Sequence, residues 1–415
     1  MNDSFSAPRR VFLFDLDGVL VEPRGYRAAI HATLEHFTRR MGLGDCYPGE
    51  EAIARFESIS MTSEWDIVPT CLAAILDALL AEHPSLKLPD NLEDACAYLC
   101  QQNLPAPQVD LTSLTQRLGD AYYGGTYADL ELVLSGHSTY RSEPPAIAES
   151  CKESPLFAHL SGHPLLNDLL ARTRQVTLSP TTRLFQTFAL GSAAFTQVYG
   201  VPAEIDTPSF LKEYDQPLIL PQTRASLLHT WQAGALDLAV YTARPSLPGE
   251  NDSQQRNSYS PEAELALEVV GMTGVPLVGY GQICHLAELC GRSPDEMVKP
   301  SPVQALAAIG TAVRRQALPA LLAAESLVFG DRNDRNADGS AYFRSLPALE
   351  IHVFEDAAGG VRAVCQAADI LIACGCPVTV HAWGITTNPT KSATLRQAGA
   401  EVFPDINTTL REIGM

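Results

Sequence analysis

Two acidic residues, separated by a single leucine, follow an apolar run near the start of the chain. The run Val11–Phe14 precedes Asp15 and Asp17, and Gly18 follows at once. Four consecutive apolar residues predict a strand buried on both faces, as in a parallel sheet. Two carboxylates at such a strand end repel each other unless a cation lies between them. The pair therefore suggests a cation site at a strand tip, and the alternative is two solvated acids.

Polar residues also end later apolar runs or open predicted helices. They are Thr242, Asp331 and Lys299. Because parallel strands end at one edge of a sheet, we expect these side chains near Asp15 and Asp17. Several oxygen donors together suit Mg²⁺. One carboxylate could attack phosphorus, the other could transfer protons, and the threonine and lysine could hold phosphoryl oxygens.

After residue 221, apolar strands alternate with helical stretches. Predicted strands cover 236–245, 275–280, 326–331, 351–356 and 378–385, and predicted helices cover 224–232, 262–270, 299–313 and 359–368. This alternation indicates βαβ units and a parallel sheet. We therefore expect an α/β fold with a three-layer, Rossmann-like core.

The segment between the first strand and residue 221 shows helical periodicity and no alternating strand run. Predicted helices cover 26–41, 51–59, 69–81, 92–101, 111–123, 165–170 and 182–199, and the polar stretch 135–164 is expected to be a surface loop. We expect an α/β core of residues 1–21 and 222–415. A helical domain of residues 22–221 is inserted after its first strand.

Composition restricts the classes of function. The 415 residues carry a formal net charge of -19, which disfavours binding to nucleic acid or to an anionic membrane surface. The start lacks the apolar region of a signal peptide, and no apolar run is long enough to span a bilayer. The ten cysteines form no CxxC pair, so reduced thiols are expected. These features predict a cytoplasmic protein.

Four ordered motifs resemble those of the haloacid dehalogenase superfamily of phosphatases. They are Phe14–Val19, the strand ending in Thr242, Lys299–Pro300 and Gly330–Asp331. The resemblance covers the first strand and most of the chain after Pro221. The helical insertion is similar to the cap domains of that superfamily. Within it, Gly25–Ile30 and Trp65–Asp66 resemble the phosphoglycolate phosphatase-like branch.

The resemblance implies a role for each motif residue. Asp15 would be the nucleophile and a Mg²⁺ ligand. Asp17 would be the general acid/base and would offer its backbone carbonyl to the metal. Lys299 would neutralise the charge of the nucleophile and phosphate. Thr242 would bind the phosphoryl group, in a site that also includes Gly18, Ala243 and Arg244. For Arg244, contact with phosphate and pairing with an acid remain open.

Two segments compete for the fourth motif. Asp331, supported by Asp334, has the spacing from Lys299 that is typical of the superfamily. The pair Glu355 and Asp356 has the typical downstream context, with two glycines and a helix following. The spacing from Lys299 favours Asp331 as the residue that completes the metal site, and Asp356 is the alternative.

The resemblance implies a Mg²⁺-dependent phosphatase that acts on a small phosphorylated metabolite through an aspartyl-phosphate. The alternatives are a phosphomutase, in which the same intermediate passes to a sugar hydroxyl, and a non-catalytic binding protein with this fold. Sequence does not separate the phosphatase from the mutase. A binding protein would be expected to lack the nucleophile or the lysine, and Asp15 and Lys299 are both present.

Overall fold

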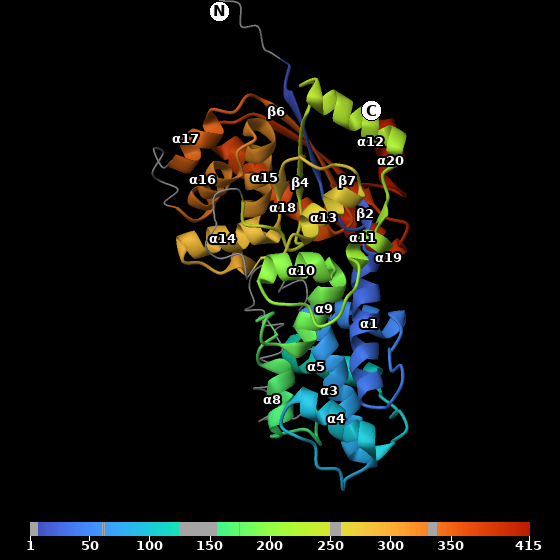
Figure 1. The fold of residues 1–415 in the computed structure, drawn as a ribbon. Helices are drawn as coiled ribbons and strands as arrows, with labels where there is room; N and C mark the ends of the chain where they lie inside the picture. Colours follow the sequence, from blue (N-terminus) through green and yellow to red (C-terminus); the bar gives the residue numbers. More distant parts are fainter. Residues whose placement is uncertain are drawn as a thin grey trace, which may run out of the picture. The chain divides into compact units, whose positions relative to one another are not determined.

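The chain forms two compact units. The computed structural model describes residues 7–59, 61, 63–123, 156–173, 175–249, 259–330 and 338–415. Residues 1–23 and 215–415 form what we call the sheet unit, and residues 24–214 form the helical unit (Figure 1). A role of the helical unit as a lid over a site stays a prediction.

The sheet unit contains a parallel six-stranded sheet. Its strands, in spatial order, are β5 (Leu277–Val278), β4 (Asp237–Tyr241), β1 (Arg9–Phe14), β6 (Leu349–Glu355), β7 (Val378–Ile385) and β8 (Glu401–Phe403). All neighbouring pairs run parallel. A separate antiparallel pair joins β2 (Val21–Glu22) to β3 (Gln216–Pro217). The predicted α/β class with a parallel sheet is confirmed.

Helices cover both faces of this sheet (Figure 1). Alternate residues of β1 enter different cores, Val11 and Leu13 one and Phe12 and Phe14 the other, and all four are fully buried. The first core includes residues of α14 (Tyr280–Cys290), α15 (Pro302–Arg314), α16 (Ala317–Phe329), α17 (Asp338–Arg344) and α18 (Ala358–Ala373). The second includes residues of α12 (Pro221–Gln232), α13 (Glu262–Val269) and α20 (Ile406–Glu412). Burial on both faces explains the unbroken apolar run of the first strand.

One predicted strand of the sheet unit is wrong. Residues 326–329 form the last turn of α16, and Gly330 follows that helix. A short apolar run does not distinguish a strand from a buried helix. Here the Ala- and Leu-rich residues before Ser326 extend the run to helical length, and Ala320, Leu321 and Ala324 pack into the core.

The described part of the helical unit contains helices and no strand. They are α1 (Arg24–Arg40), α2 (Glu50–Ser58), α3 (Glu64–Glu82), α4 (Leu92–Gln102), α5 (Leu111–Tyr123), α8 (Pro164–Leu170), α9 (Pro180–Leu190), α10 (Ser192–Tyr199) and α11 (Phe210–Tyr214). The single helix predicted over 182–199 is two helices. Gly191 separates them with φ 81°, and a Cβ there would lie 2.7 Å from the backbone nitrogen of Ser209. Only glycine accommodates this turn.

Two predicted loops lie largely outside the described residues. The residues outside the description are 135–155 of the loop predicted over 135–164 and 250–258 of the loop predicted over 246–261. Among the helices that the structure describes, none combines the length and the apolar character needed to cross a bilayer.

Candidate active site

The order of the strands defines one position at the carboxyl edge of the sheet where a ligand is expected to bind. From β1 the chain builds β4 and β5 on one side, and later β6, β7 and β8 on the other. Ligands of such sheets bind at the carboxyl ends of the strands, where the strand order reverses. Asp15 directly follows β1, and its backbone N–H donates to the carbonyl of Phe354 on β6 at 3.0 Å. The reversal point therefore lies between Asp15 and the end of β6.

Asp15 is a nearly buried carboxylate at this point, with 8% of its surface exposed. Its Oδ1 accepts a hydrogen bond from the backbone N–H of Leu16 at 2.8 Å and lies 3.0 Å from Nζ of Lys299. Burial raises the pKa of Asp15, the Lys299 ammonium opposes that rise, and the charges of Asp356 and Asp17 add to it. The side chain is both close to a cation and crowded by like charges.

Lys299 lies between two carboxylates, shortly before α15. Its Nζ donates to Oε1 of Glu355 at 2.9 Å and lies 4.4 Å from the ring centre of Tyr241. Burial alone would lower the pKa of Lys299, but Asp15 and Glu355 more than offset it, so the pKa lies above its usual range. The structure thus brings Lys299 and Asp15 together as a charged pair.

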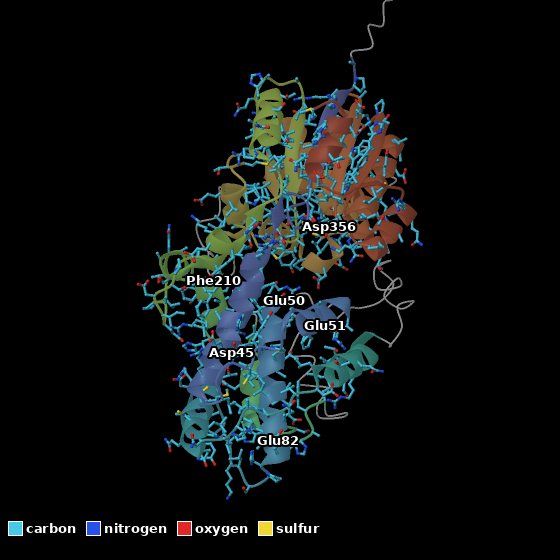
Figure 2. The ribbon with its side chains drawn as sticks, turned by 90° about the vertical axis from the view of Figure 1, so that its right-hand side faces the viewer. Asp45, Glu50, Glu51, Glu82, Phe210 and Asp356 are labelled. Atoms are coloured by element: carbon cyan, nitrogen blue, oxygen red, sulfur yellow. The ribbon has the colours of Figure 1, made fainter. Side chains whose placement is uncertain are left out.

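The end of β6 supplies two further acids. One oxygen from each of Asp15, Glu355 and Asp356 lies within 4.8 Å of the others. Glu355 is fully buried, and burial raises its pKa, with Lys299 opposing and Asp15 reinforcing that rise. Asp356, labelled in Figure 2, accepts a hydrogen bond at Oδ2 from Nζ of Lys391 at 2.5 Å. These are oxygen donors of the kind that Mg²⁺ prefers.

Of the two fourth-motif candidates, only Glu355 and Asp356 can be placed. Glu355 ends the strand that pairs with β1, Asp356 follows it, and both lie next to Asp15. Asp331 and Asp334 lie outside the described residues. The strand that was expected to carry Asp331 to the sheet edge is instead the end of α16. The predicted strand that supported Asp331 is therefore wrong, and the assignment of Asp331 to the metal site stays a prediction.

Asp17 is held by an arginine. The guanidinium of Arg244 donates from Nε to both oxygens of Asp17, at 2.9 Å each, and from Nη2 to Oδ1 at 2.6 Å. The same Nη2 donates to Oδ2 of Asp215 at 3.0 Å. Of the two roles left open for Arg244, pairing with an acid is the one present in this structure.

The remaining predicted residues lie around this cluster. Thr242 is buried after β4, and its hydroxyl accepts a hydrogen bond from the backbone N–H of Arg244 at 3.1 Å. Ala243, between them, is exposed. Gly18 has φ +75°, and a Cβ there would lie 2.7 Å from Oδ2 of Asp356. A glycine at this turn lets Asp356 approach the backbone closely.

Sequence reasoning missed three residues: Asp215, Gln304 and Lys391. The buried amide of Gln304 donates to the carbonyls of Thr242 at 2.9 Å and Val278 at 3.0 Å, and accepts from the N–H of Lys299 at 3.2 Å. Gln304 therefore fixes the backbone on which two candidate residues sit. The available signal was an amide side chain inside the largely apolar helix 302–313. Asp215 and Lys391 carry no comparable signal.

A separate cavity of about 430 Å³ lies within the helical unit. Residues 45–48, α2, α3 and α5 contribute to its wall, and Asp45 and Glu51 of this wall are labelled in Figure 2. Arg55 in the wall is paired with Glu51 at 2.9 Å. None of the carboxylates at the strand ends lines this cavity, so its size gives no support to chemistry at the sheet edge.

Comparison with known proteins bears on the fold. No protein-family model matches the chain, and no curated protein matches it. An X-ray structure from the Northeast Structural Genomics Consortium is similar to it with a TM-score of 0.59 and 13% identity, over 98% of both chains. Phosphatase Tt82 from Thermococcus thioreducens matches with a TM-score of 0.40 and 13% identity, over 97% of this chain and 98% of its own. The first likeness extends to the fold alone, and the second is too distant to carry an argument.

Proposed function

We propose that the protein is a Mg²⁺-dependent phosphatase that hydrolyses a small phosphomonoester through an aspartyl-phosphate. The observation that carries the proposal is the position of Asp15. It follows the strand at which the sheet order reverses, lies 3.0 Å from the Lys299 ammonium, and faces the acids that end β6. A carboxylate so placed can act as a nucleophile toward a phosphate bound at the sheet edge.

The charges of the cluster are suited to a divalent cation. The acidic side chains are Asp15, Asp17, Asp215, Glu355 and Asp356, and the basic ones paired with them are Lys299, Arg244 and Lys391. With all of them ionised, the acids exceed the bases by two. One Mg²⁺ would neutralise this excess. It would be held by Asp15, Asp356 and the backbone carbonyl of Asp17, while Glu355 stays with Lys299. When bound, it would neutralise phosphoryl oxygens.

In the first step, an oxygen of Asp15 would form a bond to phosphorus while the bond from phosphorus to the ester oxygen breaks. Asp17 would give a proton to the departing oxygen. In the second step, Asp17 would take a proton from water, whose oxygen attacks phosphorus. The bond from Asp15 to phosphorus breaks, and inorganic phosphate leaves.

Lys299 and Thr242 would stabilise the phosphoryl group during both steps. The Lys299 ammonium lies next to Asp15 and would compensate negative charge that gathers there. The Thr242 hydroxyl accepts from the N–H of Arg244, so its own proton can be donated to a phosphoryl oxygen. The side-chain amide of Gln304 binds the backbone of both Lys299 and Thr242. The backbone of these two residues would therefore need little rearrangement when a phosphoryl group binds.

The test measures phosphate release from p-nitrophenyl phosphate with and without Mg²⁺. We expect metal-dependent turnover by the wild type and none by Asp15→Asn. Borohydride added during turnover should reduce an aspartyl-phosphate, and mass spectrometry should locate the change at residue 15. Glu401→Gln, which neutralises an exposed acid of β8, should keep wild-type activity. Wild-type turnover by Asp15→Asn, or no turnover by the wild type with any phosphate ester of a broad panel, would overturn the proposal.

Product analysis with a sugar phosphate as substrate distinguishes hydrolysis from transfer of the phosphoryl group to a sugar hydroxyl. Free phosphate and free sugar are the expected products. An isomerised sugar phosphate without release of phosphate would identify a phosphomutase instead, since the intermediate would then pass its phosphoryl group to a hydroxyl.

A further inference from the structure

A buried arginine joins two acids on the β4 side of Asp15. We call Asp17, Arg244 and Asp215 the Arg244 bridge. Asp17 and Asp215 both bind the guanidinium, as described above, with the closest contacts at 2.6 Å and 3.0 Å. Arg244 is 3% exposed and Asp215 is 5% exposed, whereas the side chain of Asp17 is 35% exposed. The bridge thus has two buried members and one that reaches solvent.

The backbone at Asp215 is held in place by its neighbours. It directly precedes β3, whose residues Gln216 and Pro217 pair with Glu22 and Val21 of β2. The N–H of Leu218 also donates to the carbonyl of Leu20 at 2.9 Å. The backbone next to Asp215 is therefore tied to the segment that follows Asp17. A buried guanidinium held by a carboxylate on such backbone has little freedom to turn.

Asp17 is the partly exposed member of the bridge, and we expect Arg244 to fix the orientation of its side chain. It lies in the tight turn after β1, where the N–H of Gly18 donates to the carbonyl of Val21 at 2.9 Å. A partly exposed aspartate on a turn can adopt several rotamers, and ordering it costs conformational entropy. The planar fork of Arg244 contacts both oxygens of Asp17 and so selects one orientation.

The bridge also separates two acids with different tasks. Arg244 holds Asp17 toward the tip of β4, while Lys391 holds Asp356 beyond the tip of β6. We propose that Asp215 and Arg244 are positioning residues, which hold the carboxylate of Asp17 at the place from which it transfers protons in the proposed reaction. The inference rests on the proposed function. Neither residue needs to touch the substrate for this task.

The test compares variants by steady-state kinetics with p-nitrophenyl phosphate and Mg²⁺. Asp215→Asn keeps the shape of the side chain and removes its charge. We expect it to lower kcat by about 10- to 100-fold, because misplaced catalytic groups cost rates of this order, and to leave KM within about twofold. Arg244→Lys, whose single ammonium cannot hold both carboxylates in a fork, should lower kcat in the same way.

The decisive comparison uses an Asp17→Asn background. If the bridge acts through Asp17, Asp215→Asn should cause no further loss there, whereas a general structural defect would add its full effect. Asp237→Asn is the matched control. Asp237 is a buried acid of β4 that pairs with Arg9 at 2.8 Å, at the opposite end of the strand. Wild-type kcat in Asp215→Asn, or the same loss with and without Asp17, overturns the inference.

A crystal structure of Asp215→Asn separates this inference from the proposed function. We expect the side chain of Asp17 to leave its place on Arg244 or to adopt more than one rotamer. One unchanged rotamer of Asp17 overturns the positioning role, whatever the activity. Absence of phosphate release by the wild type would overturn the proposed function and would leave this structural result to decide the role of the bridge.

Discussion

Lys299 places its ammonium 3.0 Å from Oδ1 of Asp15, although the two residues come from the loop before α15 and from the tip of β1. The same ammonium donates to Glu355 at 2.9 Å. Only the folded sheet unit brings these three groups together. The contact ties the candidate nucleophile to a positive charge that persists at neutral pH, because the pKa of Lys299 lies above its usual range.

Removal of that charge should suppress activity. Lys299→Met keeps most of the side-chain volume but leaves Asp15 and Glu355 without their ammonium. We expect kcat/KM for p-nitrophenyl phosphate to fall by about 10²- to 10³-fold, as when one donor to a developing charge is lost. Lys212→Met in α11, which removes an exposed lysine of the helical unit, is the control. A loss below about fivefold in Lys299→Met, with about the same loss in the control, would contradict the role of Lys299.

The two candidates for the fourth motif can be separated by metal binding. Asp356→Asn should weaken binding of Mg²⁺ by at least about tenfold, since a proposed ligand loses its charge. Asp331→Asn should change it by less than about twofold. Titration calorimetry with MgCl₂ alone gives the affinities without reference to turnover. A large effect of Asp331→Asn together with a small effect of Asp356→Asn would restore the spacing-based assignment.

Lys391 should compete with Mg²⁺ for the carboxylate of Asp356. Its Nζ donates to Oδ2 of Asp356 at 2.5 Å, so a cation bound to Asp356 would lie near a positive charge. We expect Lys391→Met to bind Mg²⁺ about 3- to 10-fold more tightly, in keeping with a screened charge repulsion over a few ångströms. Arg396→Met removes an exposed charge from the same helix, α19 (Pro389–Gln397), and is the control. Weaker binding in Lys391→Met would mean that Lys391 orients Asp356 instead.

A histidine on the sheet should make folding stability depend on pH. His352 of β6 stacks on His381 at 4.8 Å, and its Nδ1 accepts from the indole N–H of Trp383 at 3.2 Å. Burial, together with the charges of His381 and Arg10, lowers the pKa of His352 to about 4, and the charge of Glu350 opposes this shift. The folded protein therefore keeps His352 neutral where the unfolded chain would protonate it.

The sign of this dependence follows from proton binding. Between about pH 6.5 and about pH 4 the unfolded chain holds more protons, so the free energy of unfolding should decrease as the pH falls through this window. The full loss assigned to His352 is about 3 kcal/mol. Urea unfolding at several pH values should show a shallower dependence in His352→Gln. His229→Gln, which changes an exposed histidine of α12, should keep the wild-type slope. An unchanged slope in His352→Gln would contradict this prediction.

Much of the fold could be predicted from local patterns. The run Val11–Phe14 is apolar because this central strand is covered on both faces, and an unbroken apolar run of this kind is typical of a buried parallel strand. The helices predicted over 26–41, 51–59, 92–101 and 111–123 lie within two residues of the observed helices, whereas the helix predicted over 69–81 begins at Glu64. The apolar run at 326–331 led to a wrong strand prediction. A run of this length fits a strand or a helix equally well, and only the residues before Ser326 show that it belongs to a helix. Residues 326–329 became the end of helix α16.

The positions of Asp15, Thr242 and Lys299 at strand tips and before a helix could be predicted from residue type and place in the chain, because a strand tip or a helix start is a local feature. The partners of these residues could not. Whether Asp331 or Asp356 adjoins Asp15 depends on which strand pairs with β1, and that is a property of the sheet order. Asp215 meets Arg244 only because the chain returns to the sheet unit beside β2. Local sequence thus determined which groups could react, and long-range pairing decided which of them meet.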